Sequence, residues 1–302
     1  MIDVCLAGTG GMMPLKNRWL TTCYMEYQGK GILIDCGEGT QIALAASECK
    51  LSRLEALFIT HFHADHISGL PGLLLSLGNY SKTTPLRIYG PKGIKSIVNS
   101  LCCICRNLPF ELDIIELERA SLSFAEESID PMLEIGVLPL RHTVSCLGYS
   151  FTFRRKPVFN PDKALQLNVP QKLWRVLHGG ESVEVDGKTI TTEMVTDGSR
   201  APVKLTYVTD TVAFRGIAEF AEGSDLFICE GMYGDDENNE SMQEKGHMLF
   251  SDAAGLAASA GVKELWLTHY SPALQNTMQY ADMVRGIFTN TVISRDGQRR
   301  EI

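Results

Sequence analysis

The most informative stretch of the sequence is Thr60-His61-Phe62-His63-Ala64-Asp65-His66. It holds three imidazoles and one carboxylate within six residues, after an expected buried strand over Ala56–Thr60 and before an expected helix over Ile67–Gly78. Neutral imidazole nitrogens and carboxylate oxygens are the ligands that a zinc-like divalent ion takes in proteins. Because the backbone bends between a strand and a helix, these side chains can converge. The stretch therefore predicts a metal site at a strand end.

Strand and helix signals alternate on both sides of this stretch. The predicted elements include strands over Ile2–Ala7 and Val203–Val208, a helix that Pro91 opens and that ends near Arg106, and a helix over Phe250–Ala260. Alternating strands and helices are typical of sheets whose faces are covered by helices. The chain is accordingly predicted to be of the α/β class.

Composition excludes several other classes of protein. The chain has 302 residues, of which 44% are hydrophobic and 21% charged, and these are ordinary values for a globular domain. No apolar stretch approaches the roughly 18 residues that a membrane span needs. The first residues lack a basic segment followed by an apolar one, so no signal peptide is predicted and we expect a cytoplasmic enzyme with no membrane partner.

Residues 154–196 do not continue the alternation of strand and helix signals. Three prolines and two glycine turns in this range favour an extended insert with short helical turns. The formal net charge of the chain is −8, yet basic residues outnumber acidic ones at the start of this segment: Arg154, Arg155, Lys156, Lys163, Lys172 and Arg175 stand against Asp162. Two interpretations remain open, a solvated surface loop and a local contact with a polyanion.

Three further ligand-type residues stand alone in apolar surroundings. His142 lies in Pro139-Leu140-Arg141-His142-Thr143, while Asp210 and His269 each come just after a predicted strand. Asp35 follows another apolar run, Leu33-Ile34. Their position at strand ends allows them to meet the 60–66 stretch.

The His-x-His-x-Asp-His pattern followed by Ile67-Ser68-Gly69-Leu70 resembles the metallo-β-lactamase superfamily. The resemblance implies a four-layer αβ/βα sandwich formed by residues 1–302 as one domain, with two divalent metal ions at the strand ends. Zinc is expected, with manganese and iron as alternatives. The implied ligands are His61, His63 and His142 for one ion, Asp65, His66 and His269 for the other, and Asp210 between them. Asp35 is expected to support the ligands from behind.

Three other segments narrow the resemblance to ribonuclease Z, the tRNA 3′-processing endonuclease: residues 8–18, 66–74 and 88–94. This family uses metal-activated hydroxide to attack phosphorus and removes the 3′ trailer of precursor tRNA. The resemblance therefore implies precursor tRNA as the substrate, a homodimer, and an arm at 154–196 that protrudes and grips tRNA. The implied substrate-binding residues are Lys16, Arg18, Arg154, Arg155, Lys156, Lys172 and Arg175, and Trp174 is expected to stack on nucleic acid.

The resemblance also implies catalytic roles. His247, oriented by Glu230, matches the proton donor of the family, and Asp65 is expected to orient the attacking water. The chain departs from the family at Cys229, Met248 and the pair Gln171-Lys172. These departures leave open a hydrolase of a small phosphodiester, cyclic nucleotide or sulfate ester. A non-enzymatic RNA-binding protein with a structural metal site is a third hypothesis.

Overall fold

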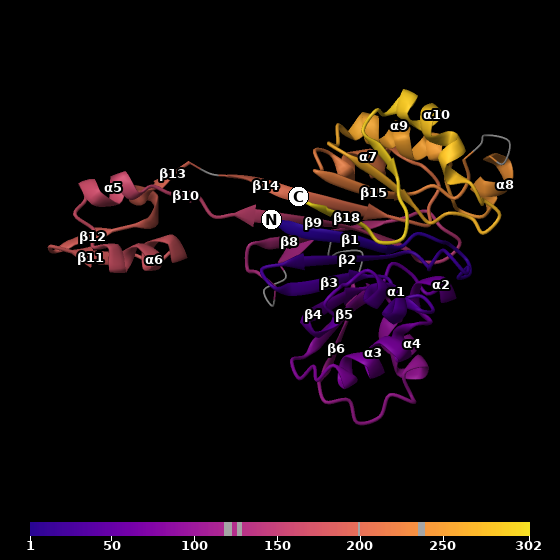
Figure 1. The fold of residues 1–302 in the computed structure, drawn as a ribbon, viewed down its shortest axis with the longest axis horizontal. Coiled ribbons are helices and arrows are strands. Elements are labelled where there is room, and N and C mark those ends of the chain that lie inside the picture. The colour runs from indigo at the N-terminus through magenta and orange to yellow at the C-terminus, as the bar shows by residue number, and fades with distance from the viewer. Residues whose placement is uncertain (118–122, 126–128, 199, 235–238) are drawn as a thin grey trace. The chain divides into compact units, whose positions relative to one another are not determined.

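The computed structural model of the chain describes residues 1–117, 123–125, 129–198, 200–234 and 239–302. It divides into two compact units (Figure 1). The first, here called the body, comprises Met1–Thr152 and Lys204–Ile302. The second, here called the arm, comprises Phe153–Val203 and contains the basic segment 154–196.

One sheet of the body is built mainly from the first third of the chain. Its seven strands are ordered β18-β1-β2-β3-β4-β5-β6, and the pairs from β3 to β6 are parallel. Parallel neighbours place their carboxyl ends at one edge of the sheet, where the following loops meet. The strands are β1 (Ile2–Gly8), β2 (Thr22–Tyr27), β3 (Lys30–Ile34), β4 (Leu54–Phe58), β5 (Leu86–Pro91), β6 (Leu112–Leu117) and β18 (Gln298–Glu301).

The second sheet of the body is ordered β17-β16-β15-β14-β9-β8-β7. The pairs from β14 to β17 are parallel, so their following loops also meet at one edge. The strands are β7 (Ser123–Ala125), β8 (Leu133–Pro139), β9 (Leu147–Arg155), β14 (Arg200–Val208), β15 (Leu226–Glu230), β16 (Leu265–Thr268) and β17 (Thr291–Ile293).

Helices cover the outer face of each sheet, which confirms the predicted four-layer αβ/βα sandwich (Figure 1). The helices next to the first sheet are α1 (Thr40–Ala46), α2 (Ala64–Ile67), α3 (Leu70–Asn79) and α4 (Ile94–Leu101), with the 3₁₀ turn η1 (Leu51–Arg53). The remaining helices of the body are α7 (Arg215–Ala221), α8 (Asn239–Glu244), α9 (Phe250–Ala260) and α10 (Ala281–Ile287), with η4 (Thr277–Tyr280). Among the described residues, no helix combines the length and the apolar character needed to cross a lipid bilayer.

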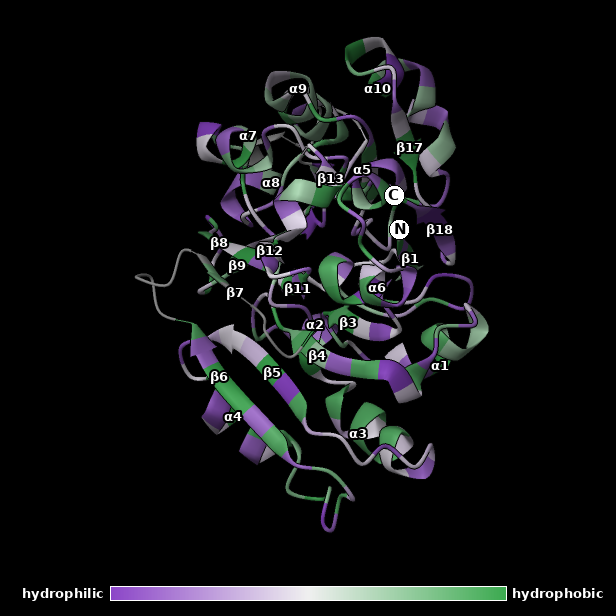
Figure 2. Ribbon diagram, turned by 90° about the vertical axis from the view of Figure 1, so that its left-hand side faces the viewer, coloured by the Kyte–Doolittle hydropathy of each residue, from purple (hydrophilic) through white to green (hydrophobic). Residues whose placement is uncertain are grey.

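The two sheets are joined by aromatic packing. Phe58 of β4 stacks on Tyr89 of β5 with ring centroids 4.6 Å apart, and its edge meets Tyr149 and Phe151 of β9, each at 5.2 Å. On the outer face of the first sheet, α3 buries four leucines and is coloured largely green in Figure 2. Burial of this apolar area is the main force that holds the layers together.

The arm has a small hydrophobic core of its own. Asn160 accepts hydrogen bonds from the backbone N–H groups of Asp162 and Lys163, so it caps the first arm helix, which begins at Pro161. The core contains Ala164, Val169, Leu177, Val183, Ile190 and Val195. The elements are β10 (Val158–Phe159), α5 (Pro161–Gln166), α6 (Gln171–Gly179), β11 (Val183–Val185), β12 (Lys188–Ile190), η2 (Thr192–Val195) and β13 (Thr196–Asp197).

The prediction of a helix from Pro91 to Arg106 was wrong at both ends. Pro91 is the last residue of β5 and pairs with Leu117 of β6. Helix α4 begins only after Gly93, whose φ of 101° lies in the left-handed region that favours glycine. It ends at Leu101, before Cys102-Cys103-Ile104-Cys105.

The backbone of Gly69 packs against the backbone of Gly37, and its N–H donates to the Cys36 carbonyl over 2.9 Å. A Cβ at Gly69 would overlap the Gly37 carbonyl oxygen. We therefore expect Gly69→Ala to lower the free energy of unfolding by about 1–3 kcal/mol, as overpacking does. Denaturant titration measures this change.

The control is Gly286→Ala in α10, where a Cβ meets no atom within 4 Å. This substitution is expected to stabilise the protein by up to about 1 kcal/mol, because alanine loses less backbone entropy in a helix. Equal effects of the two substitutions would contradict the packing argument.

Candidate metal centre and active site

The 60–66 stretch follows β4 next to the end of β3: residues 60–63 form the turn, and residues 64–66 lie in the first turn of α2. Asp35 follows β3 directly and accepts hydrogen bonds from the Thr60 N–H at 2.8 Å and the Thr60 hydroxyl at 2.9 Å. Both residues are fully buried. These bonds hold the start of the histidine-rich turn against the neighbouring strand, because β3 and β4 are parallel and end at the same edge.

The second sheet supplies the other polar residues at its own strand ends. His142 follows β8, Asp210 follows β14, Glu230 ends β15 and His269 follows β16. Asp210 and His269 have φ values of 53° and 60°, and Asp35 has 60°. Residues other than glycine rarely adopt this left-handed backbone, which costs free energy and is concentrated at functional sites.

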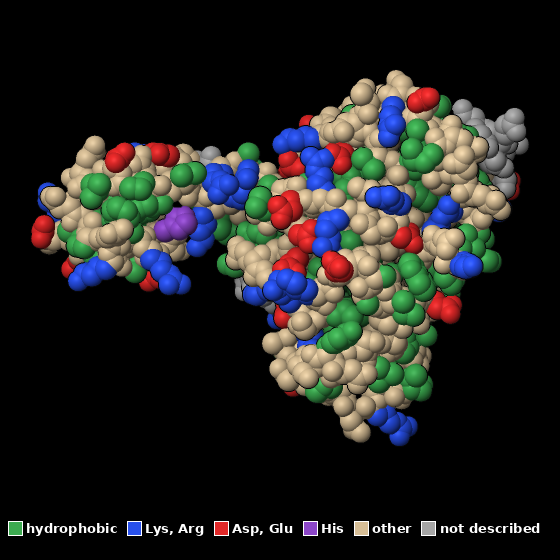
Figure 3. All heavy atoms as spheres, in the orientation of Figure 1, with side chains coloured by type: hydrophobic (Ala, Val, Ile, Leu, Met, Phe, Trp, Pro, Cys, Tyr) green, Lys and Arg blue, Asp and Glu red, His purple; other side chains and the backbone are tan. Residues whose placement is uncertain are grey.

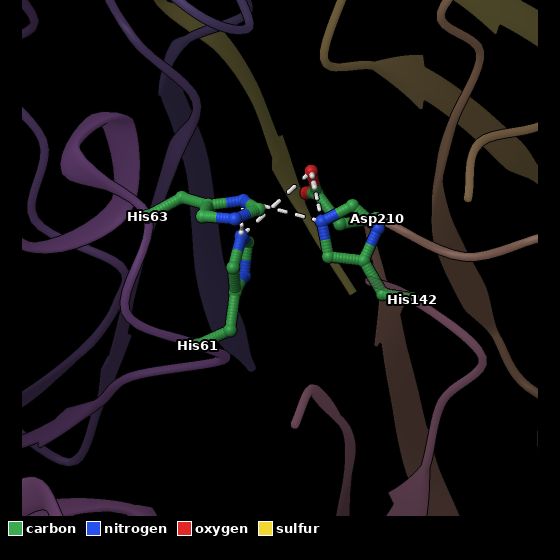
Figure 4. A group of neighbouring side chains, drawn as sticks. All are labelled: His61, His63, His142 and Asp210. Atoms are coloured by element: carbon green, nitrogen blue, oxygen red, sulfur yellow. Dashed lines mark hydrogen bonds and ion pairs between the residues drawn. The ribbon is translucent and has the colours of Figure 1, made fainter. Parts of the chain in front are cut away.

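One group of side chains gathers His61, His63, His142 and Asp210, each with one ligand atom within 4.8 Å of the others (Figure 4). His61 Nε2 lies 3.0 Å from His63 Nδ1, and His142 Nε2 lies 3.2 Å from the same atom. Asp210 Oδ1 is 3.9 Å from both His61 Nε2 and His142 Nε2. Three imidazoles and a carboxylate thus point toward a common centre.

A second group contains Asp65, His66 and His269, again within 4.8 Å of one another. His66 Nε2 lies 3.2 Å from His269 Nε2 and 3.4 Å from Asp65 Oδ2. Asp210 Oδ2 faces this group at 3.2 Å from His66 Nε2 and 3.4 Å from His269 Nε2. Asp210 therefore presents one oxygen to each group.

The donor set fits divalent cations. Imidazole nitrogens that face one another at about 3 Å cannot all be hydrogen-bonded, because a neutral imidazole has only one N–H. Burial disfavours a charged His66, yet the Asp210 and Asp35 carboxylates raise the pKa of His66 well above its ordinary value. The carboxylates around His66 thus favour positive charge there, whereas burial lowers the pKa of His61 and His142 and keeps these two imidazoles neutral, the form that binds a metal ion.

Hydrogen bonds from behind fix the orientation of the imidazoles. His66 Nδ1 lies 2.8 Å from Asp35 Oδ2, and His142 Nδ1 lies 3.0 Å from the Gly246 carbonyl. With the Nδ1 proton donated to these oxygens, Nε2 of each ring presents its lone pair to the centre. The structure thus places Asp35 behind His66.

Glu230 and His247 form a pair beside the two groups. His247 Nδ1 lies 2.9 Å from Glu230 Oε2, and the other carboxylate oxygen accepts the Thr211 N–H over 2.5 Å. Burial opposes charging of His247, but the Glu230 carboxylate outweighs it and raises the pKa of His247 to about 9. His247 Nδ1 is also 3.8 Å from Asp210 Oδ1, so the pair adjoins the candidate metal ligands.

A cavity of about 460 Å³ opens onto this site. Sequence reasoning missed several residues of its surroundings. The backbone N–H of Met12 donates to Asp65 Oδ2 over 2.7 Å, and Tyr233 and Lys245 line the cavity. Thr60 was also missed as a supporting residue, although its place directly before His61 was a usable signal. No sequence signal marks Tyr233 or Lys245.

The predicted substrate-binding residues lie outside this cavity. Lys16 is exposed, whereas Arg18 is half-buried and donates to the Ser271 carbonyl over 3.3 Å. In the arm, Arg155 donates to the Ala201 carbonyl over 2.8 Å and Lys156 to the Gly179 carbonyl over 3.1 Å. Arg154, Lys172 and Arg175 are exposed as well. On the face of the arm shown in Figure 3, blue Lys and Arg side chains edge a green hydrophobic patch.

Trp174 packs inside the arm. Its ring lies 5.4 Å from the Phe159 ring, and its indole N–H donates to the Val169 carbonyl over 3.0 Å. Trp174 is nevertheless only half-buried, and its stacking on nucleic acid stays a prediction.

Comparison with known proteins gives close relatives over the full length. The chain is 46% identical to the ribonuclease Z of Agathobacter rectalis over 302 residues, covering 100% of this chain and 98% of that protein. It is 44% identical to the ribonuclease Z of Lachnospira eligens, with 100% and 98% covered. The chain belongs to the ribonuclease Z family. Residues 2–179 also match the family described as Anti-Pycsar protein Apyc1, so the chain belongs to that family as well.

Solved structures show the same fold. The short form of human tRNase Z matches with a TM-score of 0.69 at 23% identity, covering 99% of each chain. The metallo-beta-lactamase fold protein YhfI from Bacillus subtilis matches with a TM-score of 0.70 at 18% identity, covering 100% of this chain and 99% of that one. The resemblance to ribonuclease Z and the metallo-β-lactamase fold, predicted from the sequence, is confirmed. The fold and the His/Asp groups together indicate a divalent-metal-binding member of the ribonuclease Z family.

His63 faces both His61 and His142 in the first group, so its loss removes the central donor of that group. We expect His63→Ala to lower bound metal per chain and hydrolytic activity together, measured by elemental analysis and by hydrolysis of bis(p-nitrophenyl) phosphate. The control is His178→Ala, which removes an exposed imidazole of the arm. A His63→Ala protein with full metal content would contradict this ligand set.

Proposed function

We propose that this member of the ribonuclease Z family is a metal-dependent endoribonuclease that removes the 3′ trailer of precursor tRNA. The observation that carries the proposal is the Asp210 carboxylate, whose two oxygens face two separate His-containing groups in one cavity. Full-length relatives named ribonuclease Z support the substrate assignment.

In this proposal His61, His63 and His142 hold one ion, Asp65, His66 and His269 hold the other, and Asp210 contacts both. Two such cations, when bound, activate water near neutral pH and neutralise charge on a phosphoryl group. We assign zinc to both positions, since the site is rich in imidazole, although manganese and iron accept the same donors.

In this proposal, side chains of the protein donate the proton to the leaving oxygen and align the attacking water. Glu230 accepts from His247 Nδ1, so His247 Nε2 is the atom that gives a proton to the leaving oxygen. The Thr211 N–H holds the second oxygen of Glu230 and thereby fixes this pair. Asp65 is oriented by the Met12 N–H and is assigned to align the attacking water.

The arm is assigned to tRNA binding. Its exposed cations Arg154, Lys172 and Arg175 are suited to phosphate contacts, which position a nucleic acid without reading its sequence. Arg155, Lys156 and the N-terminal Lys16 and Arg18 belong to the same proposed binding set. The homodimer stays a prediction that rests on the resemblance, and the cytoplasmic location stays a prediction that rests on the sequence alone.

Cleavage of a precursor tRNA tests the function. Bis(p-nitrophenyl) phosphate is the comparison substrate, because we expect hydrolysis of this small diester not to depend on the arm. We expect the wild-type protein to release the trailer as one fragment. In the double variant Lys172→Ala/Arg175→Ala, we expect a higher KM and a weaker salt dependence for precursor tRNA, because two phosphate contacts are lost. Hydrolysis of the small diester should stay unchanged.

The control for the arm variant is Glu181→Ala/Glu184→Ala, which removes two exposed arm charges of the opposite sign. An active diesterase that leaves precursor tRNA intact would overturn the tRNA assignment. It would favour the alternative hydrolase of a small phosphodiester, cyclic nucleotide or sulfate ester. The non-enzymatic hypothesis requires that neither substrate be hydrolysed with zinc, manganese or cobalt.

His247→Ala tests the proton donor separately from metal binding. We expect kcat for precursor tRNA to fall by about 10²- to 10⁴-fold, the usual contribution of a general acid. Metal content should stay at the wild-type level, because His247 Nδ1 is taken up by Glu230. Loss of metal in this variant, measured by elemental analysis, would show that His247 is a ligand.

A further inference from the structure

A second cavity, of about 440 Å³, adjoins the metal-site cavity and shares Tyr233 with it. We propose that this second cavity, here called the amide pocket, binds the base of a nucleotide next to the scissile phosphate. The proposal rests on the proposed phosphodiester hydrolysis and adds a subsite to it. Tyr233 lines both cavities, so a ligand that contacts it in one cavity has the other cavity at the same side chain.

The lining of the amide pocket suits a base and not a phosphate. It includes the side-chain amides of Gln275, Asn276 and Gln279 and the rings of Tyr233 and Tyr280. None of the residues that line it in the described part of the chain is charged. Amides offer both donors and acceptors, which matches the mixed edge of a nucleobase, and every base has a face that stacks on an aromatic ring.

The three amides are available to a ligand. Gln275, Asn276 and Gln279 are exposed, and their side chains have no hydrogen-bond partner among the residues that the structure describes. Their backbone is nevertheless anchored at its start, because the Leu274 N–H donates to the Ser271 carbonyl over 2.9 Å and Leu274 is buried. The amides thus extend from a fixed segment.

The aromatic walls are held from behind. The Tyr233 carbonyl accepts the Phe250 N–H over 3.0 Å, and the neighbouring Met232 carbonyl accepts the Ser271 N–H over 3.1 Å. The Tyr280 ring meets the Phe250 ring edge-on with centroids 5.8 Å apart. It also occupies the space where a Cβ of Gly234 would fall, so glycine is required there.

The same loop connects the amide pocket to the metal centre. His269 lies at the start of the segment that continues through Ser271 to Gln275 and Asn276. Tyr270 between them is buried, and its N–H donates to the Thr9 carbonyl over 2.9 Å. Because one short, anchored segment carries both a candidate metal ligand and the amides, a bound base would fix the position of its own phosphate relative to the centre.

The test compares substrates that share a leaving group and differ in the base. These are bis(p-nitrophenyl) phosphate, which has no base, and the p-nitrophenyl esters of the four nucleoside 5′-monophosphates. We expect wild-type kcat/KM to be higher for at least one nucleoside ester than for the base-free diester. In Tyr233→Ala this advantage should fall by about 10-fold, within the range for loss of one stacked base. Asn276→Ala and Gln279→Ala should change the ranking of the four bases.

Tyr80→Ala, just after α3, and Asn99→Ala, in α4, are matched controls, since each removes an exposed side chain of the same type from the body. Tyr233→Phe keeps the ring and should retain the stacking advantage, which separates stacking from a folding defect. Equal kcat/KM ratios in wild type, Tyr233→Ala and Asn276→Ala would overturn the amide pocket.

The two proposals fail differently. If precursor tRNA stays intact while the base preference exists and disappears in these variants, the amide pocket stands and the tRNA assignment falls. If precursor tRNA is cleaved while the variants leave the base preference unchanged, the amide pocket falls and the tRNA assignment stands.

Discussion

The Asp210 carboxylate imposes the strongest constraint on this structure, because its two oxygens face two groups of imidazoles from different parts of the fold. The first sheet supplies the 61–66 turn, and the second supplies His142, Asp210 and His269. The site therefore forms only when the two sheets pack against each other with their strand ends side by side. The aromatic contacts of Phe58 with Tyr149 and Phe151 lie between the sheets, so core packing and metal binding depend on the same interface.

Two buried carboxylates, Asp35 and Glu230, each contact one imidazole of this centre. Asp35 is fully buried behind His66, and Glu230 stands behind His247. Each carboxylate helps to raise the pKa of its imidazole, although burial opposes this. The two carboxylates make the same kind of contact with an imidazole. The two imidazoles differ in their place: His66 Nε2 faces His269 and Asp65, whereas His247 lines the cavity. Similar pairs can thus serve metal binding and proton transfer.

Much of the candidate site was predictable because its residues have short-range signals. The 60–66 stretch is dense in ligand-type residues, and Asp210 and His269 directly follow apolar strands. The arm was less predictable. The sequence did not indicate that the ring of the half-buried Trp174 packs on Phe159, or that its indole N–H donates to the Val169 carbonyl. Pro91 indicated a helix start, yet pairing with β6 kept it in a strand. The surroundings of Trp174 and Pro91 depend on contacts with other segments of the chain, which the local sequence does not reveal.

The sequence by itself determined the alternation of strands and helices, the ligand-type residues at strand ends and the likeness to ribonuclease Z. These features follow from residue type and local spacing, which the chain order contains. Only the tertiary structure decided which nitrogen and oxygen atoms face one another, that Glu230 holds His247, and that Tyr233 lines both the metal-site cavity and an amide-lined cavity. These contacts join residues far apart in the chain, and packing of two sheets and their loops sets them.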